Sequence, residues 1–140
     1  MSCSRPLQPG LNLQKNQVTP ATEIKRERVI LGAKSCDIEA ISLIEEVYCG
    51  KDYTDVYFKD KRKATTIIGM ACDAPLSTCF CSATGGGPFV RKGSDLFLID
   101  LGDAYLVEGI TEKGKRILDN KYFKEASSAD LALAEEVENK

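Results

Sequence analysis

The 140-residue sequence contains no histidine, and this absence narrows the chemistry that the chain can perform. Catalytic arrangements of the Ser-His or Cys-His kind are excluded, and so is every zinc site that depends on imidazole ligands. Any metal chemistry must therefore use thiolates or carboxylates. The sequence offers six cysteines for this purpose.

Long apolar runs and an excess of positive charge are also missing. No stretch approaches the ~20 apolar residues of a membrane-spanning helix, and the residues after Met1 lack the apolar core of a signal peptide. We therefore expect a cytoplasmic protein with no membrane partner. The formal net charge is −2, whereas nucleic-acid binders usually carry a basic face. No nucleic-acid partner is expected either.

Short apolar segments in the first half of the chain predict parallel strands separated by a helix. Residues 29–32 and 64–71 are continuous apolar or β-rich runs, which are typical of strands buried on both faces. Between them, apolar residues recur at helical spacing over residues 38–47. This pattern predicts a helix with Asp37 as its N-cap and Gly50 as its stop.

The second half of the chain predicts a hairpin and two further helices. Residues 95–101 and 104–108 are expected to form strands joined by a tight turn at Gly102. Residues 111–118 and 129–137 have helical patterns, and the second of these is amphipathic. The expected fold is therefore α/β, with a small, partly parallel sheet, flanking helices and a C-terminal β-hairpin.

Composition divides the chain into three parts. Residues 1–25 contain three of the five prolines and show little periodicity, so we expect an irregular N-terminal arm. Residues 26–126 are expected to form the cysteine-containing α/β domain. Residues 127–140 would then be a C-terminal amphipathic helix or tail.

Four cysteines lie at or beyond the ends of the two predicted parallel strands. Cys36 follows the first strand at the start of a helix, Cys72 follows the second, and Cys79 and Cys81 lie in the loop behind it. Ligands of open α/β sheets collect at this edge, and loops of this length are commonly functional. An extended backbone through Cys79-Phe80-Cys81 would aim both sulfurs to one side.

A shell of four cysteines suits an iron–sulfur cluster of the 4Fe–4S or 2Fe–2S type, or a structural zinc ion. The helix N-terminus at Cys36 would favour its thiolate and could donate amides to cluster sulfurs. The spacing alone leaves open zinc, and also cysteines that are simply small buried side chains at strand ends. Cys49, at the end of the predicted helix, is expected to pack, and Cys3 to be a spare thiol.

Gly85, Gly86 and Gly87 form a glycine run after the cysteine pair. Such a run could approach a phosphate or a flavin, but it lacks the ending of a P-loop and the spacing of a dinucleotide motif. We expect these glycines to let the loop wrap closely around a cofactor or a neighbouring backbone, because glycine accepts unusual torsions. A flavin or nucleotide site is an alternative.

Four motifs follow one another along residues 29–118. They are Gly32-Ala-Lys-Ser-Cys36-Asp37-Ile-Glu-Ala-Ile41, then Asp55-Val-Tyr-Phe58 with Lys61-Arg62, then Ile67-Ile-Gly-Met-Ala-Cys72 with Thr78-Cys-Phe-Cys81 and Gly86-Gly-Pro88, then residues 95–108. This succession resembles the N-terminal cysteine-containing domain of the iron–sulfur (4Fe–4S) subunit family of sulfhydrogenase (beta chain) and anaerobic sulfite reductase. Lys34 stands where that family usually has arginine, and Val56 where it has proline.

The resemblance implies an electron-transfer role. Proteins of this family pass electrons between a flavoprotein and the catalytic subunit of a hydrogenase or reductase in anaerobic redox complexes. By resemblance, Cys36, Cys72, Cys79 and Cys81 would hold one iron–sulfur cluster, expected to be 4Fe–4S, in a chain that is not itself catalytic. The family's ferredoxin-like region is absent after Cys81, so we expect a fragment, a stand-alone version or a split-gene product. The alternative is a zinc-stabilised or metal-free scaffold that docks such a complex.

Overall fold

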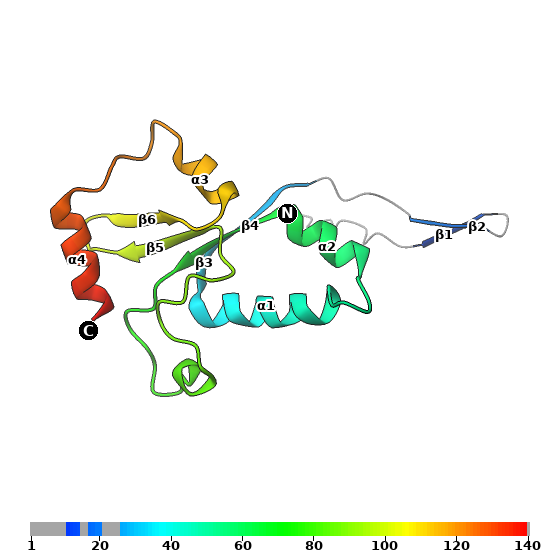
Figure 1. The fold of residues 1–140 in the computed structure, drawn as a ribbon, viewed down its shortest axis with the longest axis horizontal. Helices are drawn as coiled ribbons and strands as arrows, with labels where there is room; N and C mark the ends of the chain where they lie inside the picture. The colour runs from blue at the N-terminus through cyan, green and yellow to red at the C-terminus, as the bar shows by residue number, and fades with distance from the viewer. Residues whose placement is uncertain (1–10, 15–16, 21–25, 140) are drawn as a thin grey trace, which may run out of the picture.

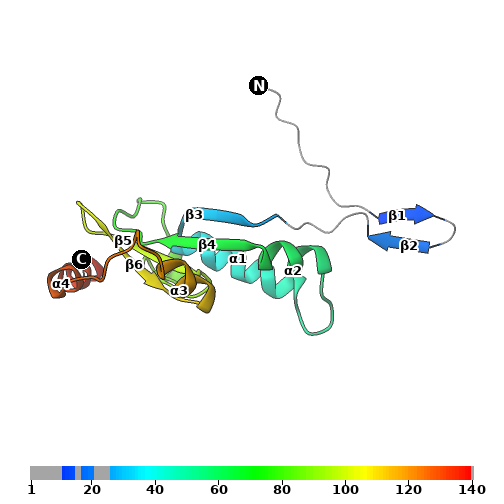
Figure 2. The same ribbon diagram turned by 90° about the horizontal axis from the view of Figure 1, so that it is seen from above.

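A computed structural model describes residues 11–14, 17–20 and 26–139 of the chain. In chain order, its elements are β1 (Leu11–Gln14), β2 (Gln17–Pro20), β3 (Arg28–Lys34), α1 (Ser35–Tyr48), α2 (Val56–Lys63), β4 (Thr65–Met70), the short 3-10 helix η1 (Cys81–Thr84), β5 (Leu96–Asp100), β6 (Tyr105–Gly109), α3 (Glu112–Leu118) and α4 (Ser128–Glu138). Strands β3 and β4 lie with α1 and α2, and the β5–β6 hairpin lies with α3 and α4 (Figures 1 and 2). Among the described residues, no helix has both the length and the apolar composition needed to cross a membrane.

The main sheet has four strands in the order β3-β4-β5-β6. Strand β4 pairs in parallel with both β3 and β5, whereas β5 and β6 form an antiparallel hairpin. This arrangement confirms the predicted α/β fold with a partly parallel sheet and a C-terminal hairpin. Because β3 and β4 run in the same direction, the segments that follow them leave the sheet at the same edge.

The N-terminal segment differs in part from its prediction as an irregular arm. Strands β1 and β2 form a separate antiparallel pair, in which Leu11 lies opposite Pro20 and Gln14 opposite Gln17. The period-two alternation of leucine with polar residues in β1 favours this extended structure. The rest of residues 1–25 lies outside the described residues.

Helix α1 begins before the residue that was predicted to cap it. Its N-cap is Lys34, and Asp37 is the third residue of the helix. The Asp37 carboxylate accepts the backbone N–H of Lys34 over 3.2 Å, which is the return half of a capping box. The prediction of Asp37 as N-cap is therefore wrong by one turn, although this side chain still satisfies an exposed amide at the helix start. The helix ends at Tyr48, close to the predicted stop.

Two buried apolar clusters lie against the sheet and meet across Gly69 of β4. One contains Ala33, Ile38 and Ile67, and the other contains Ala71, Phe97, Ile99 and Ala134. A Cβ at Gly69 would lie 2.7 Å from Ile38 Cδ1 and 2.9 Å from Phe97 Cδ2, which is closer than carbon atoms approach. Glycine at this position therefore lets α1 pack directly on the sheet, and α1 is thereby held against the strand end that precedes Cys72.

Asp95 is a buried polar link between β4, β5 and α3. Its carboxylate accepts the backbone N–H of Ile67 over 2.9 Å and the hydroxyl of Thr111 over 2.7 Å. Its carbonyl oxygen accepts the N–H of Ile110 over 2.9 Å. Asp95 is 7% exposed, and its buried polar atoms find their hydrogen-bond partners within the protein.

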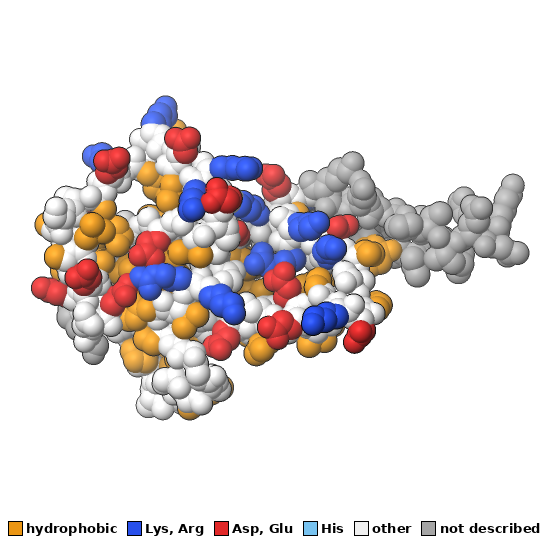
Figure 3. All heavy atoms as spheres, in the orientation of Figure 1, with side chains coloured by type: hydrophobic (Ala, Val, Ile, Leu, Met, Phe, Trp, Pro, Cys, Tyr) orange, Lys and Arg blue, Asp and Glu red, His pale blue; other side chains and the backbone are white. Residues whose placement is uncertain are grey.

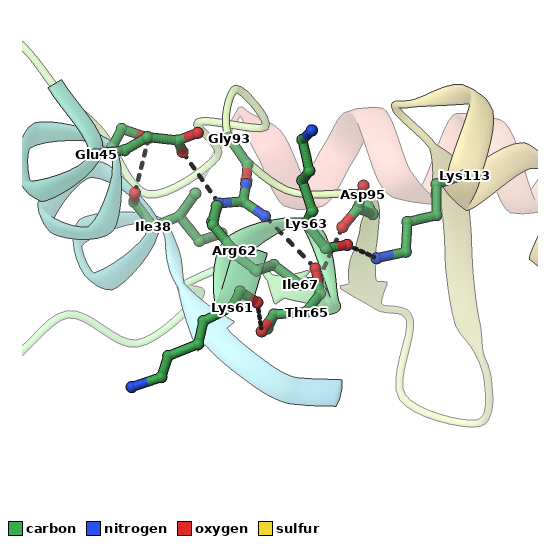
Figure 4. A network of polar contacts seen from close by, with 11 residues as sticks. Ile38, Glu45, Lys61, Arg62, Lys63, Thr65, Ile67, Gly93, Asp95 and Lys113 are labelled. Atoms are coloured by element: carbon green, nitrogen blue, oxygen red, sulfur yellow. Dashed lines mark hydrogen bonds and ion pairs between the residues drawn. The ribbon is translucent and has the colours of Figure 1, made fainter. Parts of the chain in front are cut away.

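Arg62, at the end of α2, connects four segments in the network of Figure 4. Its Nε donates to Glu45 of α1 over 3.0 Å, and its terminal nitrogens donate to the carbonyl oxygens of Gly93 over 3.2 Å and Thr65 over 3.5 Å. Within the described part of the chain, the neighbouring Lys61 contributes its backbone to this network, since its carbonyl oxygen accepts the hydroxyl of Thr65. In the basic pair that carries part of the family resemblance, Arg62 therefore has a structural role.

We expect Arg62→Ala to lower the free energy of unfolding by about 2 kcal/mol, because it removes a partly buried ion pair and leaves two carbonyl oxygens without this donor. Lys61→Ala is the matched control, and it should change stability by no more than about 0.5 kcal/mol. Urea denaturation followed by circular dichroism measures both values. Equal losses in the two variants would contradict the structural role of Arg62.

Helix α4 is held on the β5–β6 hairpin by Arg91. This side chain pairs with Glu108 of β6 and with Glu138 of α4, and it lies over the Phe97 ring at 5.3 Å. The hydrogen bond with Glu108 is the main reason that the pKa of Arg91 is raised. At the other end of α4, hydrogen bonds from Ser127 lower the pKa of Asp130. The C-terminal helix is thus capped at its start by Ser127 and held on the hairpin near its end by Arg91.

Candidate metal centre

The fold brings three cysteine-bearing segments to the carboxyl edge of β3 and β4. Cys36 is the second residue of α1, directly after β3, and Cys72 follows the end of β4 by two residues. Cys79 and Cys81 lie on the loop that leaves from Cys72, and Cys81 is the first residue of η1. The placement of Cys36 and Cys72 at neighbouring strand ends agrees with the prediction from the apolar runs.

One carbonyl oxygen joins these segments. The oxygen of Pro88, at the far end of the cysteine loop, accepts the backbone N–H of Cys72 over 3.0 Å and the hydroxyl of Ser35 over 2.9 Å. A second bond crosses the same edge, from Lys34 Nζ to the carbonyl oxygen of Ala71 over 3.0 Å. The start of α1, the end of β4 and the base of the loop are therefore fixed relative to one another.

Beyond its base, the loop is a self-contained unit. Every hydrogen bond that the structure describes for residues 73–87 is made within the loop. For example, Cys79 donates its N–H to Leu76, and Gly86 donates its N–H to Cys81, each over 3.0 Å. A unit that makes few hydrogen bonds to the rest of the domain can move as a body at small cost.

The backbone of the cysteine pair turns instead of extending. Phe80 has φ −138° and ψ 14°, and Cys81 opens a 3-10 helix. The Sγ atom of Cys79 accepts the N–H of Leu76 over 3.3 Å, which stabilises the preceding turn. The prediction of two sulfurs aimed to one side by an extended strand is therefore wrong, because local turn hydrogen bonds determine the backbone here.

The thiols of the candidate site are accessible and unpaired. Cys36 and Cys79 are exposed and Cys72 and Cys81 are partly exposed, and none of them forms a disulfide within the described chain. This exposure contradicts the alternative of small, fully buried cysteines at strand ends. Cys49 is the C-cap of α1, at the opposite end of the helix from Cys36. Cys3 lies outside the described residues.

The donor chemistry of the site fits an iron–sulfur cluster, since the four thiols come from segments joined at one edge and histidine is absent. The geometry is less complete. Within residues 26–139 and the two short strands, no group of three or more cysteine, aspartate or glutamate side chains is close enough to hold a metal ion. A shell of four would require the loop to move toward Cys36 and Cys72.

One position of the glycine run lies in a tight space. A Cβ at Gly86 would lie 2.4 Å from Glu39 Oε2 and 3.2 Å from the carbonyl oxygen of Cys81. Gly85 has φ +85° and ends η1 in the left-handed region. A Cβ at Gly87 would make only an ordinary contact with Val90, at 3.9 Å. At Gly86 the loop therefore lies close to the Glu39 side chain of α1. The role of the three glycines at a cofactor stays a prediction.

The cysteine loop forms an uncharged lobe. Residues 74–90 contain no aspartate, glutamate, lysine or arginine, and the lobe at the bottom of Figure 3 shows no charged side chains. Leu76 and Phe80 are 73% and 71% exposed on it, on either side of Cys79. Sequence reasoning identified the cysteines of this lobe but missed Ser35 and the Pro88 carbonyl at its base, because nothing in these residue types indicates a shared hydrogen bond.

Comparison with known proteins gives one informative relative. The chain is 33% identical over 138 residues to the sulfhydrogenase 2 subunit beta of Pyrococcus furiosus. The match covers 97% of this chain and 40% of the relative, so the chain spans less than half of that protein's length. No protein-family model matches the chain, and no solved structure matches it. Over nearly its whole length, the chain is therefore similar to part of a sulfhydrogenase beta subunit, which supports the resemblance inferred from its four motifs.

Proposed function

We propose that the chain binds one iron–sulfur cluster, of the 4Fe–4S type, through Cys36, Cys72, Cys79 and Cys81. In this role residues 26–126 form the electron-transfer module of a hydrogenase-type or sulfite or sulfur reductase-type complex. The observation that carries the proposal is that the Pro88 carbonyl, at the base of the loop that bears Cys79 and Cys81, accepts hydrogen bonds from the Cys72 amide and from Ser35 beside Cys36, at the sheet edge where α/β proteins bind their ligands. The similarity to a sulfhydrogenase beta subunit supports the choice of iron over zinc.

An iron–sulfur cluster supplies reversible one-electron redox chemistry and needs no nucleophile or proton donor from the protein. The chain's own residues bind the cluster and orient its ligands. The four thiolates are the ligands, and the N-terminal amides of α1 favour negative charge beside Cys36. The base of the loop is held at Pro88 and keeps Cys72 next to the start of α1. The rest of the loop supplies Cys79 and Cys81 as the other two ligands.

The same proposal assigns partners of a defined kind. Electrons would arrive from and leave to other redox proteins, namely a flavoprotein and the catalytic subunit of a hydrogenase or reductase, so the chain alone would not be an enzyme. The uncharged lobe with Leu76 and Phe80 exposed beside Cys79 supports this assignment. Electron transfer needs a short distance, and apolar surface near a redox centre favours close approach of a partner.

Anaerobic reconstitution tests the cluster directly. After incubation with ferrous iron and sulfide, the chain should hold iron and acid-labile sulfide in equal amounts, about four of each per chain, and show broad visible absorption. The protein should show no reductase activity toward sulfite, sulfur or protons without its partner proteins. Equimolar zinc with no iron or sulfide under the same conditions would favour the zinc-stabilised scaffold instead, and a released yellow cofactor would favour a flavin site.

A further inference from the structure

Ser35 carries a buried hydroxyl that reaches across the chain to the end of the cysteine loop. The residue is 2% exposed, and its Oγ donates to the carbonyl oxygen of Pro88 over 2.9 Å. The two residues are 53 positions apart in the sequence. This bond is therefore a tertiary contact, and it is distinct from the local hydrogen bonds that serine often makes with its own helix.

The same Pro88 oxygen accepts the backbone N–H of Cys72 over 3.0 Å. A carbonyl oxygen has two lone pairs, so it can accept both bonds at full strength. Ser35 directly precedes Cys36, and Cys72 is itself the second donor. The Pro88 oxygen thus fixes the spacing between the backbones of two cysteines that come from different strand ends.

We propose that Ser35 is a positioning residue of the metal centre, acting on Cys36 and Cys72 through the Pro88 carbonyl. Its hydroxyl keeps these two backbones in fixed register before a metal arrives, so that only the loop with Cys79 and Cys81 has to be ordered on binding. Preorganisation of this kind raises the affinity for the metal by lowering the entropic cost of ordering the ligands on binding. The inference rests on the proposed function for the metal itself, whereas the Ser35 contact is a property of the chain alone.

Lys34 contributes a second bond across the same edge, to the carbonyl oxygen of Ala71 over 3.0 Å. Its side chain is longer than that of serine and only partly buried, and flexible side chains hold a geometry less tightly. Loss of the Ser35 hydroxyl should therefore loosen the edge without separating α1 from β4. The packing of Ile38 against Gly69 remains in place as well.

The first test compares cluster retention in Ser35→Ala, Ser35→Thr, Ser42→Ala and the unmodified chain, each reconstituted anaerobically with ferrous iron and sulfide. With an iron chelator in excess, visible absorption should decay about tenfold faster in Ser35→Ala, in the range seen when residues that orient metal ligands are removed. Ser35→Thr keeps the hydroxyl and should restore slow decay. Ser42→Ala is the matched control, because the Ser42 hydroxyl donates to Ile38 within the same helix over 3.0 Å. Equal decay rates in Ser35→Ala and the unmodified chain would overturn the proposal.

The second test uses metal-free protein and separates this inference from the proposed function. Backbone hydrogen exchange at Cys72 should be about tenfold faster in Ser35→Ala, because the Pro88 carbonyl is then held at only one point, while exchange inside α1 stays unchanged. If the unmodified chain takes up no cluster, the proposed function fails and exchange at Cys72 still decides the positioning role. Unchanged exchange at Cys72 in folded Ser35→Ala would refute that role even in a chain that binds a cluster.

Discussion

Replacing Cys36, Cys72, Cys79 or Cys81 singly by alanine should abolish the cluster. Each iron of a cluster needs an anionic ligand from the protein, and with no histidine in the chain a lost thiolate can be replaced only by a carboxylate, by water or by another cysteine. We expect iron and sulfide contents near zero and no visible absorption after anaerobic reconstitution. Each of the four residues, on three separate segments, supplies one ligand. All four replacements should therefore lower the iron and sulfide contents to a similar extent.

Cys49→Ala is the control for this series. Cys49 is the C-cap of α1, at the other end of the helix from Cys36, and it pairs with Thr54 through a single isolated β-bridge. Removing its thiol should cost about 1 kcal/mol of packing at most and leave iron content and spectrum unchanged. A bleached Cys49→Ala protein, together with a coloured Cys36→Ala protein, would show that the ligand assignment is wrong.

Metal loss should also change the behaviour of the loop. Because a metal that joins separate segments contributes part of the folding free energy, residues 73–87 should be cleaved faster by protease in the four ligand variants. The described hydrogen bonds of these residues are all internal to the loop, so without a metal they are connected to the domain by its base and by the close approach of Gly86 to Glu39 of α1. Cleavage should stay slow at α1, whose Ile38 is fully buried.

Apolar pattern was sufficient to predict much of the fold. The two apolar runs became the parallel pair β3 and β4, and the hairpin became β5 and β6, with bounds within a residue or two of those expected. Strands β4 and β5 are predictable because burial favours their apolar residues, among them Ile67 and Phe97, which are fully buried. Strand β3 was predicted to be buried on both faces, and that part is wrong: it is an edge strand of the sheet, and its Val29 and Leu31 are 63% and 71% exposed. Helix α2 was not predicted, although Asp55 caps it by accepting the N–H of Phe58 over 2.8 Å, and basic residues fill its last turn.

The candidate site was predictable in its residues and not in its geometry. Strand ends placed Cys36 and Cys72 correctly, because parallel strands leave a sheet at one edge. The turn at Phe80 could not be read from a Cys-Phe-Cys spacing, since it depends on hydrogen bonds between Leu76, Cys79 and residues farther along the loop. Likewise, only the fold shows that the buried side chain of Asp95 joins β4 to α3.

Gly114→Ala should destabilise the domain strongly, by about 3 kcal/mol or more, because no space exists for the added methyl group. A Cβ at Gly114 would lie 1.9 Å from the carbonyl oxygen and 2.7 Å from the carbonyl carbon of Asp95, and neither is a flexible side chain that could turn aside. Helix α3 would have to move away from β5. That movement would break the bond between Thr111 and the Asp95 carboxylate, which also holds the amide of Ile67 in β4.

Gly87→Ala is the matched control, since its Cβ meets only Val90, at 3.9 Å. Urea denaturation of both metal-free variants should give a large loss of stability for Gly114→Ala and a change within about 1 kcal/mol for Gly87→Ala. Full stability in Gly114→Ala would mean that α3 does not pack against the Asp95 backbone, and the buried link from β4 through Asp95 to α3 would then be incorrect.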